Sequence, residues 1–131
     1  MAGEQELARH FLQEGFRARR GQQHRGGPDA PDVIVDDLPW LHVECKRTET
    51  LTPYAALTQA QDDAGDDQLP IVCHRRNHHE WIAIIRLDDL LTIIRNTPNV
   101  GPASEIPGFE SITEQEADEQ DLTVAQLFEN G

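Results

Sequence analysis

The stretch PDVIVDDLPWLHVECKR, residues 31–47, combines two strand-like runs with acidic and basic side chains. Asp32 stands directly before the apolar run 33–35, and the second run carries Glu44 and Lys46 with one residue between them. Because successive side chains of a strand point to opposite faces, Glu44 and Lys46 project together. If the two runs pair as a hairpin, Asp32 comes near Glu44 on the same side. The stretch therefore predicts two carboxylates and a lysine side by side.

These side chains have the chemistry that phosphodiester hydrolysis needs. Mg²⁺ takes oxygen ligands, commonly one or two carboxylates together with waters and substrate phosphate, and we expect Mn²⁺ to substitute for it. Asp32 and Glu44 supply such ligands, and the backbone carbonyl of Cys45 is a further candidate. A bound metal polarises the phosphate and lowers the pKa of the attacking water. Lys46 is then placed to orient or deprotonate that water, or to stabilise the charge that develops on phosphorus.

A helix is predicted over residues 4–14, EQELARHFLQE, and it brings in one more carboxylate. Its inward stripe is defined by apolar residues at three- and four-residue spacing: Leu7, Ala8, Phe11 and Leu12. Glu4 lies three and four residues before the first two of these, so it belongs to the inward stripe. Two interpretations remain open for Glu4. It is either a further metal ligand, direct or through water, or a first-turn residue that complements the helix dipole.

Charge divides the chain into two parts. The formal net charge is −13 at pH 7, and residues 101–131 contribute −8 of it, with eight Asp or Glu and no Lys or Arg. We expect one folded domain over residues 1–98, a length that suits a single core, and an acidic tail over 99–131. The overall charge opposes simple electrostatic binding to nucleic acid. Local basic clusters can nevertheless hold phosphates: Arg17, Arg19, Arg20 and Arg25 before the hairpin, and Arg75 and Arg76 further on.

The remaining pattern predicts the fold class. Helices are expected over about 53–64 and around 90–94, and strands over 16–20, 69–73 and 80–85. Together with the first helix and the two runs of 31–47, this gives the order α-β-β-β-α-β-β-α. Such an order favours a mixed central sheet flanked by helices, an α/β domain.

Composition also predicts a location. No apolar run approaches the length of a membrane span, and the first residues lack the features of a signal peptide. We expect a cytoplasmic protein without membrane contact. The two cysteines, Cys45 and Cys73, are expected to be free thiols within or at the end of apolar runs.

The spacing of Asp32 and Glu44-Cys45-Lys46, with Pro31 before the aspartate and eleven residues between, resembles the PD-(D/E)XK nuclease superfamily. The wider context is similar to archaeal-type Holliday junction resolvases, including versions carried by phages, over about residues 3–95. The segments that carry this similarity are GEQEL at 3–7, GF at 15–16, RR at 19–20 and VCHRRN at 72–77 ahead of EW at 80–81. The resemblance implies a restriction-endonuclease-like core in the nuclease domain 1–98.

The resemblance also assigns roles to individual residues. It implies that Glu4, Asp32, Glu44 and Lys46 form the catalytic set, with the three carboxylates as metal ligands. Arg20 matches a basic residue that such resolvases place near the scissile phosphate. These proteins commonly have Arg after the helix glutamate where this chain has a glutamine, so one phosphate contact is missing or supplied elsewhere. Two accessory residues are expected to face the site or its substrate: Gln59 and His42.

The function that this resemblance implies is Mg²⁺-dependent endonucleolytic resolution of four-way DNA junctions in recombination and repair. A junction is two-fold symmetric and needs paired cuts, so we expect a homodimer with one site per chain. Two alternatives stay open: a restriction- or repair-type nuclease on duplex or flap DNA, and a non-catalytic protein-binding module on the same scaffold. The tail end, residues 126–128, is similar to peptides that bind sliding clamps, but the match is too short to assign that partner.

A zinc site is a rival interpretation of the histidines near residue 75. His74 and His78 are four residues apart, a spacing that serves metal binding on a helix. The segment is expected to be a strand and turn, which does not bring residues four apart together. A histidine-rich surface hairpin, including His79, is the favoured interpretation.

Overall fold

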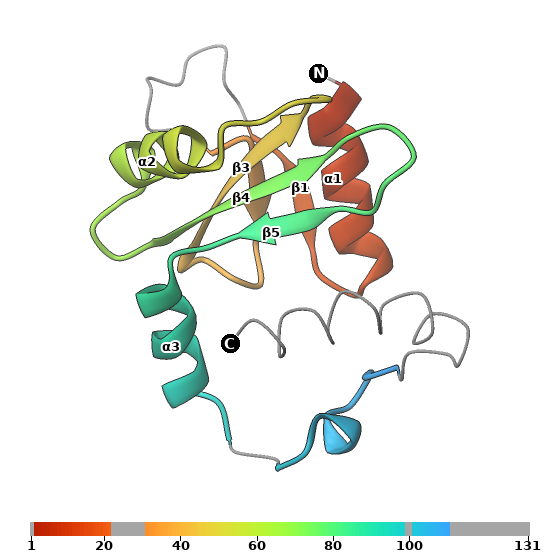
Figure 1. The fold of residues 1–131 in the computed structure, drawn as a ribbon, viewed down its shortest axis with the longest axis vertical. Helices are drawn as coiled ribbons and strands as arrows, with labels where there is room; N and C mark the ends of the chain where they lie inside the picture. The colour runs from red at the N-terminus through yellow and green to blue at the C-terminus, as the bar shows by residue number, and fades with distance from the viewer. Residues whose placement is uncertain (1, 22–30, 99–100, 111–131) are drawn as a thin grey trace, which may run out of the picture. The chain divides into compact units, whose positions relative to one another are not determined.

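The computed structural model describes residues 2–21, 31–98 and 101–110, and Figure 1 labels its helices and strands. The chain divides into two compact units, Met1–Asn96 and Thr97–Gly131. The first unit contains, within its described residues, a five-stranded mixed sheet flanked by helices. The predicted α/β class with a mixed sheet is therefore confirmed.

The strands lie in the order β1-β2-β3-β4-β5 across the sheet. Their bounds are β1 Ala18–Arg20, β2 Val33–Val35, β3 Leu41–Arg47, β4 Leu69–Arg75 and β5 Ile82–Ile84. β1, β2 and β3 pair antiparallel in succession, β3 and β4 are parallel, and β5 returns antiparallel to β4. A parallel pair needs a crossover connection, which here is the helix α2, Pro53–Asp63.

The helix α1, Ala2–Gln13, covers one face of the sheet (Figure 1). Its Leu7 and Ala8 pack with Val33, Val43 and Cys73 in the larger hydrophobic core. The inward stripe is confirmed for these residues, with the half-buried Phe11 packed against them. The prediction for Leu12 is wrong, since its side chain is 53% exposed. The helix ends before Gly15, whose φ of 95° is the left-handed conformation expected at a C-cap.

The helix α2 covers the opposite face through small side chains. Ala56 and Ala60 are its buried residues, and they form a second core cluster with Val72 of β4. Val72 and its neighbour Cys73 point to opposite faces, so the two clusters lie on the two sides of the sheet. Pro53 is the first residue of this helix, as predicted, because its fixed φ and missing N–H suit that position.

The helix α3, Leu87–Arg95, has an inverted burial pattern. Its buried residue is Asp89, which accepts two hydrogen bonds of 2.8 Å from the guanidinium of Arg86. The apolar stripe at i, i+3, i+4 and i+7 is exposed instead: Leu87, Leu90, Leu91 and Ile94. The helix is amphipathic as predicted, but this apolar face lies on the surface.

The second unit contains the short 3₁₀ helix η1, Ala103–Glu105, between Gly101 and Gly108, which both have positive φ. Residues 126–128, which are similar to peptides that bind sliding clamps, lie outside the described residues, as does Arg25. Among the described residues, no helix has both the length and the apolar content that a membrane span requires.

Candidate functional site

Asp32 is held at the start of β2 by the neighbouring strand. Its N–H donates to the carbonyl of Val43 at 3.0 Å, and its Oδ2 accepts from the N–H of Cys45 at 2.8 Å. Because Val33 pairs with Val43 in the antiparallel register, Asp32 lies opposite Glu44. The expectation that the hairpin brings these two carboxylates together is confirmed.

Glu44 lies on the α2 face of β3 and is buried. Its Oε1 is 2.8 Å from Nε2 of His42, which belongs to the same strand face two residues earlier and has no exposed surface. His42 was expected to touch substrate or to be half-buried. The half-buried interpretation is wrong, because the ring has no exposed surface and Glu44 is its partner, and the accessory role of His42 toward substrate stays a prediction.

The electrostatics of Glu44 reflect its crowded surroundings. Burial raises the pKa of the Glu44 carboxyl above its ordinary value of 4.5, because the charged form loses hydration. The hydrogen bond with His42 acts in the opposite direction, and the neighbouring Asp32 carboxyl, close enough to share a hydrogen bond, adds to the rise. Two carboxylates in contact disfavour a second negative charge, and a divalent cation between them removes that penalty.

Lys46 completes this face of β3. It lies two residues after Glu44, so both side chains project from the same side of the strand. Its side chain is half-buried and, within the described parts of the chain, makes no ion pair or hydrogen bond. The Lys46 ammonium therefore has no protein partner among those residues. It lies on the same strand face as Glu44.

Glu4 approaches from the other layer. It is buried in the first turn of α1, with 9% of its surface exposed, and its Oε2 lies 3.2 Å from Nε of Arg20. Gly3 allows this approach, since a Cβ at that position would lie only 2.6 Å from Cβ of Arg47. Burial raises the pKa of the Cys45 thiol to about 12, and the charges of Asp32 and Glu4 contribute, so both carboxylates lie near that residue.

Asp32 and Glu44 are thus brought together, whereas a three-residue cluster is not formed. In the described ranges, no group of three His, Cys, Asp or Glu side chains has a geometry that could hold a metal ion. The two adjacent carboxylates still fit a hard cation such as Mg²⁺, because such ions commonly take one or two protein carboxylates and complete their coordination with water. The role of Glu4 as a ligand stays a prediction.

The candidate phosphate-binding arginines lie on the surface with partners of their own. Arg17 forms a two-pronged contact with Asp37, at 2.6 and 2.9 Å, and Arg19 lies 3.4 Å from Asp36. Exposed pairs of this kind contribute little to stability, so a phosphate can replace the carboxylate at small cost. Their role in DNA binding stays a prediction, as does that of Arg20 beside Glu4.

An ion-pair cluster that sequence inspection missed joins α1 to β3 and β4. Glu6 contacts Arg47 at 3.3 Å and also pairs closely with Arg75. Burial alone would raise the pKa of Glu6, but the hydrogen bonds from Arg75 and Arg47 lower it below 4.5. The sequence signal for such a cluster consists of charged residues at corresponding positions of two strands and a helix face. This signal does not identify which residues pair.

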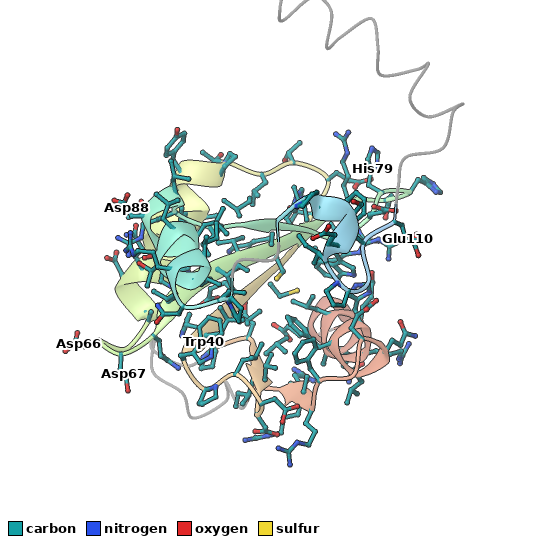
Figure 2. The ribbon with its side chains drawn as sticks, turned by 90° about the horizontal axis from the view of Figure 1, so that it is seen from below. Trp40, Asp66, Asp67, His79, Asp88 and Glu110 are labelled. Atoms are coloured by element: carbon teal, nitrogen blue, oxygen red, sulfur yellow. The ribbon has the colours of Figure 1, made fainter. Side chains whose placement is uncertain are left out.

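A groove of about 810 Å³ opens beside the end of β4. Its lining includes His74, Arg75, Arg76, His78 and His79. Nε2 of His74 forms a hydrogen bond of 2.9 Å with the carbonyl of Thr48. The turn residue His79, labelled in Figure 2, accepts a hydrogen bond of 2.9 Å from the guanidinium of Arg76. His74 and His79 thus form hydrogen bonds within the fold. Among the described residues, no cluster of His, Cys, Asp or Glu could hold a zinc ion.

Gln59 is an exposed residue of α2, next to the buried Ala60, and its accessory role stays a prediction. The two cysteines are free, as predicted, and Cys73 is buried.

No family model, curated protein or solved structure matches this chain. The chemistry of the site has to be inferred from its own side chains.

Proposed function

We propose that this chain is a divalent-metal-dependent DNA endonuclease whose chemistry is carried by Asp32, Glu44 and Lys46. The observation that supports this most directly is the contact between the Asp32 and Glu44 carboxyls across the β2–β3 pair, with a lysine that has no described partner on the same strand face. A buried carboxylate such as Glu44 beside a second, partly buried one is costly in a metal-free fold, and cation binding relieves that cost. This cost is a reason to assign them a role beyond stability.

In the proposed mechanism, Asp32 and Glu44 would hold the metal, and the Cys45 carbonyl and Glu4, directly or through water, would be further ligands. A bound Mg²⁺, or Mn²⁺ in its place, would supply Lewis-acid polarisation of the phosphate and a lowered pKa for the attacking water. Lys46 would orient or deprotonate a water, or neutralise charge on the phosphate. Asp32 stays oriented through its hydrogen bond from the Cys45 N–H.

The proposed fold family is the PD-(D/E)XK nuclease superfamily. Support comes from the succession α1-β1-β2-β3-α2-β4, in which an antiparallel hairpin carries the acidic motif and α2 connects β3 to the parallel β4. The resemblance of the segments 3–7, 15–16, 19–20 and 72–77 to archaeal-type resolvases is the reason for proposing a four-way DNA junction as the substrate. Its phosphates would meet two groups of basic side chains: Arg17, Arg19 and Arg20 at and just before β1, and Arg75 and Arg76 at the groove beside β4. Arg25, which follows the first group in the sequence, is part of the same proposal.

A homodimer is part of this proposal, because paired cuts need two sites and one chain offers one. The exposed stripe of α3 supports it. Leu87, Leu90, Leu91 and Ile94 form an apolar face that a second copy would remove from water. Tyr54, also exposed, lies with Leu87 along one shallow apolar pocket between α2 and the start of α3.

The proposal is tested by incubating the full chain with end-labelled four-way junction, flap and duplex oligonucleotides of matched sequence, in Mg²⁺ and in EDTA. We expect paired, symmetric cuts in the junction with Mg²⁺ and none with EDTA. Equal cutting of duplex or flap would replace junction resolution by a general nuclease activity. No metal-dependent cutting of any substrate would contradict the nuclease assignment.

A further inference from the structure

His42 is a completely buried histidine whose side chain contacts a buried carboxylate. The side chain has no exposed surface, although histidine is seldom buried completely and a buried polar group costs free energy unless it is hydrogen-bonded. Its hydrogen bond is the 2.8 Å contact between Nε2 and Oε1 of Glu44. Its other ring nitrogen, Nδ1, is buried and has no partner among the described residues. Nδ1 of His42 is therefore unsatisfied among the described residues, whereas Nε2 contacts Glu44.

The surroundings explain how the ring is fixed. His42 lies on the face of β3 that α2 covers, opposite Pro70 of the parallel strand β4. The buried residues of α2 are the small Ala56 and Ala60, which leave room for an imidazole between helix and sheet. A ring held in this way has few alternative orientations. Nε2 is therefore held beside the Glu44 carboxylate, and it donates to Oε1 in the tautomer that carries its proton on Nε2.

We infer that His42 is a positioning residue of the proposed metal site, which orients the Glu44 carboxylate from below. Glu44 without this donor would be a buried carboxylate beside Asp32, free to rotate away from it. With Oε1 bonded to His42, the carboxylate is held on the side of Asp32, which also lies close to it. Hydrogen bonds to metal-binding carboxylates of this kind commonly determine metal affinity. The inference rests on the proposed function, because it takes Glu44 as a ligand.

The test compares substitutions that differ in where they place a donor, with Mn²⁺ affinity measured by titration calorimetry on the full chain. His42→Gln places an amide N–H near the position of Nε2, whereas His42→Asn places it near Nδ1. We expect Gln to retain wild-type affinity and Asn and His42→Leu to lose about 10- to 100-fold. Because a merely structural role for His42 would not rank Gln above Asn in metal binding, this ranking is the decisive readout.

A matched control is His74→Leu, which removes a second buried histidine, one that bonds a backbone carbonyl instead of a carboxylate. It is expected to leave Mn²⁺ affinity unchanged. If His42→Leu does not fold, as judged by circular dichroism, the comparison of Gln with Asn decides. Wild-type affinity in the Asn variant would overturn the role of His42 and leave the nuclease proposal standing. Absence of Mn²⁺ binding by the wild-type chain would overturn both.

Discussion

The Oδ2 atom of Asp32 accepts a hydrogen bond of 2.8 Å from the backbone N–H of Cys45, so the acidic residue at the start of β2 is fixed by the strand that carries Glu44 and Lys46. This contact depends on an oxygen acceptor and not on charge. An asparagine at position 32 can keep it and lose only the negative charge. The two properties of Asp32, its place and its charge, are therefore separable by one substitution.

Glu44→Gln is expected to raise the melting temperature of the metal-free protein at pH 7 by a few degrees. The folded-state pKa of Glu44 is raised above 4.5, so the stability it contributes is present below pH 4.5 and is lost as pH rises through the folded value. At pH 7 the charged form is the destabilised one, and glutamine avoids it. Thermal denaturation at pH 7 and pH 4 measures the difference, which should vanish at the lower pH.

The exposed Glu14 provides the control for this measurement. Glu14→Gln is expected to change the melting temperature little at either pH. Addition of Mg²⁺ should stabilise the wild-type protein and leave Glu44→Gln unaffected, since a ligand that binds only the folded state raises its stability. A lower melting temperature for metal-free Glu44→Gln at pH 7 would contradict the assigned cost of the buried charge.

Arg20→Gln is expected to weaken DNA binding uniformly across sequences and to reduce the slope of log affinity against log salt by about 1. The side chain is half-exposed beside Glu4, where a phosphate can take the place of the carboxylate. Fluorescence anisotropy in EDTA at several salt concentrations measures both effects. Arg95→Gln, at the exposed end of α3, is the control and should leave the slope unchanged. An unchanged slope in Arg20→Gln would remove Arg20 from the phosphate contacts.

Leu91→Asp is expected to convert a wild-type dimer into a monomer without loss of helix content. The substitution places a charge in the exposed apolar stripe of α3, where a second copy would bury it without a partner. Light scattering coupled to size-exclusion chromatography measures the mass. Leu12→Asp is the matched control, because Leu12 is similarly exposed but belongs to α1. A wild-type monomer, or a Leu91→Asp dimer, would exclude this face as the interface.

Local patterns in the sequence predict the elements around the site well. Alternation places Glu44 and Lys46 on one face, and the short polar break between the runs produces the pairing that brings Asp32 opposite Glu44. Gly15 and Pro53 mark a helix end and a helix start because their backbone preferences are intrinsic to the residue.

The sequence does not predict which side chains are buried or which partners they contact, because both depend on which layer covers each face. The alternation that puts His42 on the face of Glu44 does not reveal that His42 is completely buried on the side that α2 covers. Leu12 and the stripe of α3 satisfy helical periodicity, yet no described layer covers them. The pairing of Glu6 with both Arg47 and Arg75 joins residues far apart in the chain. Each case depends on tertiary packing, which periodicity does not encode.

Cleavage of the labelled junction by Asp32→Asn tests the central claim most directly. Asp66→Asn is the control, because Asp66 is exposed in the loop before β4, as Figure 2 shows. With Mg²⁺ present and folding verified by circular dichroism, we expect Asp66→Asn to cut like the wild type. Asp32→Asn should lose at least about 100-fold in rate, a loss comparable to removing one preorganised transition-state contact. Metal-dependent cleavage by Asp32→Asn at the wild-type rate would contradict the account.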